Sequence, residues 1–184
     1  MRIINEQTKT APVLADVAIE SMKKALLNLP WIDQAFGRAW PILMQRGQKN
    51  VTEPCVYTKG DSYETVVPSM DLGNYTFVVL MDATRIVEDM YIQPFALIVW
   101  YDMRRCFTNG ANRRDTENLK SDIITTIDEL AFSNGSVTIN RIKEMPKEVY
   151  REFTFDTQAN QALVQPYGAM RFEGEIKMLI GCYN

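Results

Sequence analysis

The sequence predicts a single α+β domain, in which two main helices pack on one face of a mixed, mostly antiparallel sheet, preceded by an extended arm. Residues 13–28 and 116–131 carry apolar side chains at three- and four-residue spacing, the period of a helix with one buried face. Apolar runs at residues 75–81 and 94–101 have the length of strands. Residues 170–182 alternate in part between apolar and charged side chains, as a half-buried strand does.

The first twelve residues differ from the rest of the chain. They are polar, show no periodic pattern and end in Ala11-Pro12, which predicts an extended arm ahead of a domain at residues 13–184. Such an arm either frays as a chain terminus or lies on a neighbouring subunit. The first predicted helix follows, and Pro30 stops it because proline cannot continue the hydrogen-bond pattern of a helix.

An aromatic and irregular stretch, residues 31–41, comes next and can hold one short strand. Its large side chains are Trp31, Phe36 and Trp40. Buried aromatic residues dominate both cores and protein interfaces. The three residues therefore either close one end of the core or anchor a partner subunit.

Short strands are predicted over most of the remaining chain. Residues 54–57 and 63–67 form a hairpin through the turn at Gly60-Asp61. Residues 94–101 are almost continuously apolar, which predicts a central strand covered on both faces. A strand at residues 136–143 follows the second helix, and Gly174 marks a possible bulge in the last strand.

Composition restricts the chemistry that the chain can perform. It has 184 residues and no histidine, so Ser-His-Asp triads, Cys-His pairs and histidine-based metal centres are excluded. Its three cysteines, Cys55, Cys106 and Cys182, are far apart and lack the spacing of a zinc site or a disulfide framework. We therefore expect free thiols, no metal and no cofactor.

Charged residues suggest two further readings. Four arginines, Arg104, Arg105, Arg113 and Arg114, flank one polar loop and suit contact with an acidic neighbour or with DNA, or simply an exposed, solvated loop. The net charge of −3 argues against a broad DNA-binding surface. The acidic residues Asp82, Glu88, Asp89 and Asp102 follow or lie between strands, and they are the basis of an alternative reading: a carboxylate-based enzyme or small-ligand module.

Three features resemble the small ring-forming neck and tail-completion proteins of tailed bacteriophages. They are a helix ending in Leu27-Asn28-Leu29-Pro30, the apolar strand Phe95–Trp100 followed by Tyr101–Arg105 and Asn112-Arg113-Arg114, and the helix Glu117–Ile123 that leads to two strands. The group includes tail terminators and the connector or tail-barrel rings of short-tailed phages, among them the crAss-like phages. The resemblance is one of pattern and order over residues 13–182.

This resemblance implies a structural virion protein without enzymatic activity. It would form a homo-oligomeric ring at the head–tail junction or in the tail and line or seal the DNA channel. The implied partners are copies of itself, neighbouring neck or tail proteins, and genomic DNA that passes without sequence-specific binding. The expected location is the virion, assembled in the host cytoplasm, and no membrane is involved. The surfaces expected to meet other subunits are the arm, the aromatic stretch and the arginine loop.

Overall fold

The computed structural model describes residues 1–60, 62–106, 116–130, 132, 134–155, 163 and 166–180. The helices are α1 (Ala15–Leu26), η1 (Met70–Leu72, a 3-10 turn), α2 (Met103–Cys106), α3 (Glu117–Asp128) and α4 (Pro146–Val149). The strands are β1 (Gln34–Arg38), β2 (Trp40–Arg46), β3 (Lys49–Thr58), β4 (Ser62–Thr65), β5 (Tyr75–Leu80), β6 (Arg85–Val87), β7 (Met90–Asp102), β8 (Gly135–Lys143) and β9 (Tyr167–Leu179). No helix among these residues is long and apolar enough to cross a bilayer.

The main sheet confirms the predicted class of a mixed, mostly antiparallel α+β fold. Its strands lie in the order β1-β5-β7-β9-β8. The short β6 also pairs with β7, at its first residues, Met90–Ile92. Only the β1–β5 pair is parallel, and the other pairs are antiparallel. The predicted central strand is β7. It pairs with β5 over Phe95–Trp100 on one side, and with β9 along its whole length on the other.

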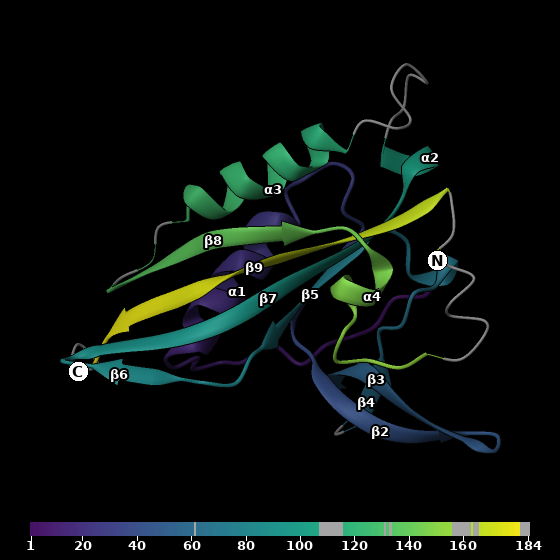
Figure 1. Cartoon of the computed structure of the whole chain (residues 1–184), viewed down its shortest axis with the longest axis horizontal. Helices are drawn as coiled ribbons and strands as arrows, with labels where there is room; N and C mark the ends of the chain where they lie inside the picture. The colour runs from purple at the N-terminus through teal and green to yellow at the C-terminus, as the bar shows by residue number, and fades with distance from the viewer. Residues whose placement is uncertain are drawn as a thin grey trace.

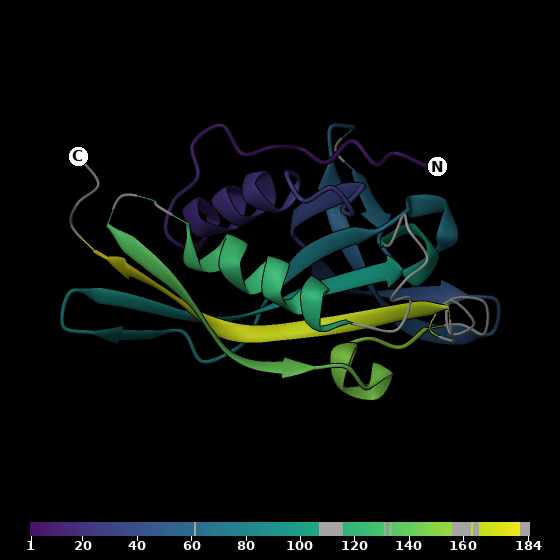
Figure 2. The same cartoon turned by 90° about the horizontal axis from the view of Figure 1, so that it is seen from above.

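The two main helices lie side by side on one face of this sheet, as predicted (Figure 2). The side chains of β7 point alternately into two separate hydrophobic cores, one on each face of the sheet. Phe95, Leu97 and Val99 pack in the core beneath α1 and α3. Ile98 and Trp100 point to the opposite face, where a second core forms against α4 and the small sheet. A strand buried on both faces has to be apolar throughout, which explains its sequence.

The second sheet was not predicted. Strands β2, β3 and β4 form a separate three-stranded antiparallel sheet, shown below the main sheet in Figure 1. The predicted hairpin is present as β3 and β4, where Tyr57 pairs with Tyr63. However, β3 is longer than expected. The irregular stretch at residues 31–41 holds the one short strand predicted there, β1, and β2 begins only at its last two residues and continues beyond it.

The N-terminal segment lies on its own chain, which differs from both alternatives for the predicted arm. The backbone N–H of Ile4 donates to the side-chain oxygen of Gln34 at 3.2 Å, and the Ile4 side chain is buried in the second core. The N–H of Gln7 donates to the carbonyl of Tyr57, and the N–H of Lys59 donates to the carbonyl of Asn5. The segment therefore continues the small sheet beyond β3 instead of fraying.

Candidate interaction surfaces

Two of the three aromatic residues proposed as partner anchors are part of the cores. Trp31 is only 6% exposed, packs in the core beneath the helices, and its indole N–H donates to Asp122 of α3 at 2.9 Å. Phe36 is 3% exposed and lies against Tyr75 in the second core. This corrects the expectation that Trp31 and Phe36 anchor a partner subunit, because both side chains are buried.

We expect Trp31→Phe to lower the free energy of unfolding by about 1 kcal/mol, because it removes the partly buried hydrogen bond to Asp122. Trp40→Phe is the matched control, since Trp40 is half-buried at the surface, and it should change stability by less than half as much. Urea unfolding followed by circular dichroism measures both. Equal effects would contradict the assignment of Trp31 to the core.

The third residue, Trp40, belongs to an aromatic patch on the small sheet, made of Trp40, Tyr57 and Tyr63, with Arg38 of β1 beside it. The Trp40 and Tyr63 rings meet edge to face with centroids 6.0 Å apart, and the Tyr57 and Tyr63 centroids lie 5.3 Å apart. The Arg38 guanidinium lies 5.0 Å from the Trp40 ring centroid, within the range of a cation–π contact. Tyr57 and Tyr63 were missed as site residues, although both lie in the predicted hairpin.

The two arginines that the structure describes in the predicted loop are paired with carboxylates of their own chain. Arg104 forms a forked pair with Asp102, with distances of 2.9 and 2.7 Å. Arg105 donates to Asp33 at 2.9 Å. Arg113 and Arg114 lie outside the described residues. Because both pairs are about half exposed on the arginine side, they still leave guanidinium surface for a partner.

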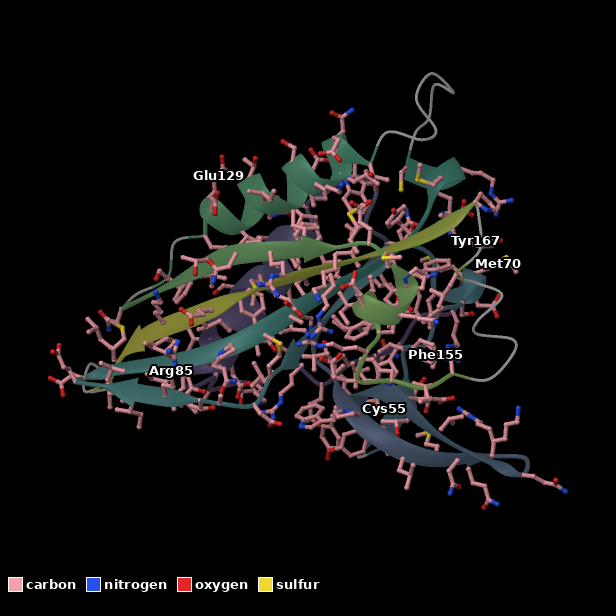
Figure 3. The ribbon with its side chains drawn as sticks, viewed as in Figure 1. Cys55, Met70, Arg85, Glu129, Phe155 and Tyr167 are labelled. Atoms are coloured by element: carbon pink, nitrogen blue, oxygen red, sulfur yellow. The ribbon has the colours of Figure 1, made fainter. Side chains whose placement is uncertain are left out.

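These pairs also fix the charge at this end of the sheet. Burial raises the pKa of Asp102, but the hydrogen bonds from Arg104 outweigh burial and hold the pKa below its ordinary value. Arg104 also donates to the hydroxyl of Tyr167 at 3.1 Å, and Tyr167 lies beside Met70 (Figure 3). A carboxylate held ionised in this way is a poor proton donor or acceptor near neutral pH.

The acidic residues of the alternative reading do not converge. Asp82 follows β5 at the end where Leu80 pairs with Phe95, whereas Asp102 closes β7 beyond the pairing of Trp100 with Tyr75. Eight residues of extended strand between Pro94 and Asp102 span roughly 25 Å. Glu88 lies farther still, in the β6–β7 turn. Within the described ranges, no three acidic or cysteine side chains gather as a metal site would require.

The thiols that the structure describes are not reactive centres. Burial raises the pKa of Cys55 to about 11 and that of Cys106 to about 12, so both thiols stay protonated at neutral pH. Both are free cysteines. Cys182 lies outside the described residues.

A hollow of about 240 Å³ lies beneath the N-terminal segment, between α1 and β1. Glu6 reaches into this region, where Lys23 of α1 donates to it and the Gly37 N–H donates at 2.9 Å. Burial raises the pKa of Glu6, and the pair with Lys23 opposes that rise. The hollow is smaller than most ligand sites, and Glu6, Lys23 and Asp33 in its lining are already paired, so it serves to seat the N-terminal segment.

This chain matches no protein-family model, no curated protein and no solved structure. The function of this chain is therefore inferred from the geometry of its own surface.

The exposed aliphatic side chains in the described strands, with Ile180 next to them, lie at two projecting ends of the molecule. One end is the β6–β7 turn together with the end of β9, where Ile86, Val87, Leu179 and Ile180 are exposed. The other is the β2–β3 hairpin, which carries Leu43. Figure 1 shows that these two ends lie at opposite extremes of the long axis. Neither end was identified from sequence, since each is a short strand next to a turn.

Proposed function

We propose that this chain is a structural protein of a tailed bacteriophage, which forms a homo-oligomeric ring at the head–tail junction or in the tail. In that ring it lines or seals the DNA channel, and genomic DNA passes without sequence-specific binding. The order of elements that carries the resemblance supports the proposal: α1 precedes Leu29-Pro30, and β7, α3, β8 and β9 follow along the chain.

The observation that carries the proposal is that the exposed aliphatic side chains of the sheets lie at two different, opposite ends, the β6–β7 turn and the β2–β3 hairpin. A ring needs two different surfaces on each subunit, since each copy contacts one neighbour with one surface and the other neighbour with the second. A self-complementary dimer would need only one such surface. The separation of Asp82, Glu88 and Asp102, described above, gives no support to the alternative of a carboxylate-based enzyme.

The proposal predicts that the purified full-length chain assembles into closed rings. Native mass spectrometry over a range of concentrations should give one dominant oligomer, and negative-stain electron microscopy should give class averages with rotational symmetry about an open channel. We expect assembly to strengthen with concentration, as mass action requires. A species that stays monomeric at all concentrations, and also in the presence of phage neck and tail proteins, would overturn the proposal.

A further inference from the structure

We infer that the ring contact joins two particular surfaces: the acidic tip of one copy docks on the basic hairpin of the next. The acidic tip comprises Ile86, Val87, Glu88, Asp89, Leu179 and Ile180. The basic hairpin comprises Leu43, Arg46 and Lys49. The inference deepens the proposed function and rests on it, since it names which surfaces of the subunit meet.

The two surfaces differ in sign. Glu88 and Asp89 form the exposed turn between β6 and β7. Near the tip, Arg85 and Lys177 both pair with Glu175, which leaves one positive charge against the two carboxylates of the turn, so the tip stays net negative. At the other end, Arg46 and Lys49 flank the β2–β3 turn and are both exposed. The carboxylate of Glu53 is almost fully buried and pairs with Arg46, so the hairpin stays net positive through Lys49.

Both surfaces also offer apolar area to water. Ile86 is 68% exposed and Val87 is 52% exposed at the acidic tip. Leu43 is 70% exposed on the hairpin, on the face of β2 opposite to that of Arg46 and Lys49, so its apolar surface and the basic charge lie on the two sides of the same projecting strand pair. Apolar side chains next to charge are typical of protein interfaces, because the apolar area supplies affinity and the charge supplies orientation. Each surface therefore binds the other surface on a second copy of the chain.

The backbone of the acidic tip supports a role for its charge. Glu88 adopts a φ of 55°, in the left-handed region that favours glycine. The equivalent turn of the basic hairpin places Gly47 at a φ of 60°, where glycine is unstrained. Glu88, the first residue of the β6–β7 turn, therefore keeps a carboxylate although its backbone conformation is strained. Strained residues of this kind cluster at functional sites.

Strand addition at the sheet edges is a weaker way to join copies of this chain. The outer edge strand β8 carries Arg141 and Lys143 and is interrupted by a bulge between Ile139 and Arg141. The edge strand β2 contains Pro41, which has no N–H to donate. Charges, bulges and prolines are the features by which proteins protect sheet edges from pairing. Side-chain contact between the two ends is therefore favoured over a shared sheet.

Charge reversal tests this contact. Glu88→Lys and Lys49→Glu should each weaken ring assembly by about tenfold at low salt, because each places like charges across the contact. Placing both substitutions in one chain should restore assembly to within about threefold of the original. Mixing equal amounts of the two single variants should also restore contact between unlike copies, since each then meets an oppositely charged surface on the other; the alternating copies close a ring when its subunit number is even and form pairs or open chains when it is odd. Sedimentation velocity over a salt series measures all four samples.

Two further variants separate this contact from general effects. Lys147→Glu changes the net charge by the same amount as Lys49→Glu at an exposed position of α4, away from both surfaces, and should leave assembly unchanged. Glu88→Gly should weaken assembly while raising the melting temperature of the dissociated subunit by a few degrees, about 2–4 °C, because it relieves the strained turn. A residue with a purely structural role would not give these opposite responses.

The outcomes distinguish the two proposals. If the unmodified chain forms rings and the charge reversals leave them unchanged, this contact is wrong and the ring proposal stands. If the unmodified chain remains monomeric under all conditions tested, the ring proposal fails and the contact fails with it. Loss of assembly in both single variants and its recovery in the double variant and in the mixture would support both.

Discussion

Replacing Arg171 by methionine is expected to lower the free energy of unfolding by about 3 kcal/mol, because it leaves two partly buried carboxylates, Glu152 and Glu173, with only the half-exposed Arg151 to pair with. The Arg171 side chain is fully buried in β9, on the face opposite the two main helices. It donates to both oxygens of Glu152 at 2.6 Å, to Glu173 at 2.7 Å and to the carbonyl of Val149 at 3.1 Å. The guanidinium thus holds α4 and the residues after it against the central strands.

The matched control is Arg85→Met, which breaks the exposed pair with Glu175 and should change stability by less than about 1 kcal/mol. Adding Glu152→Gln and Glu173→Gln to Arg171→Met should recover part of the loss, since neutral amides tolerate burial better than unpaired carboxylates. Denaturant unfolding of the four proteins measures these differences. Similar effects of Arg171→Met and Arg85→Met would contradict the role of this network.

The same network sets a dependence of stability on pH. Burial raises the pKa of Glu152, but the hydrogen bonds from Arg171 outweigh burial and hold it below its ordinary value of 4.5. A carboxyl group whose pKa is lowered by folding stabilises the fold above its unfolded pKa. That contribution is lost as the pH falls from about 4.5 through the lower folded value. Arg171→Met should therefore reduce the loss of stability between neutral and acid pH.

The sequence predicted the main sheet well because its strongest signals are local. The apolar run that became β7 and the helical spacing of α1 and α3 each follow from burial of a single element. In the small sheet, β3 and β4 were predicted as a hairpin, whereas β2 and the first half of β3 were missed. Pro41 lies in β2, and proline usually argues against a strand. The turn between β2 and β3 is formed by Gly47 and Gln48, and this stretch lacks the strongly apolar run that marks β7.

Site residues were harder to predict because type alone does not show exposure. Trp31 and Phe36 have the character of anchors, yet tertiary packing buries them, whereas Trp40 stays at the surface. Arg171 gave no signal, since a charged residue in an alternating strand predicts a solvent-facing position. Its burial depends on Glu152, which lies nineteen residues earlier in the chain and meets it only after folding. The two projecting ends likewise depend on which strands extend beyond their neighbours.

Gly174→Ala is the second substitution with a large expected effect. Gly174 pairs with Phe95 of β7 on one side and with Ile139 of β8 on the other, in the interior of the main sheet. A Cβ atom at this position would lie 1.8 Å from the carbonyl oxygen of Thr138 and 3.0 Å from the Phe95 ring. The sequence indicated a bulge at Gly174, whereas the irregular register lies in the partner strand, between Ile139 and Arg141. The bulge brings the β8 backbone close to Gly174, so only glycine fits.

Because the obstructing atom belongs to the backbone, the alanine cannot be accommodated by rotating a side chain, and β8 has to move away from β9. We expect a loss of about 3 kcal/mol or more in the free energy of unfolding. For a domain of this size that corresponds to a fall of roughly 6–12 °C in melting temperature. Gly60→Ala is the control, since its Cβ would meet only the Ser62 hydroxyl at 3.9 Å. Hydrogen exchange should show lost protection in β8 with α1 retained, because β8 is an edge strand that can separate while the rest of the sheet stays paired. A melting temperature within about 2 °C of the unmodified chain would show that the β8–β9 pair is looser than this geometry requires.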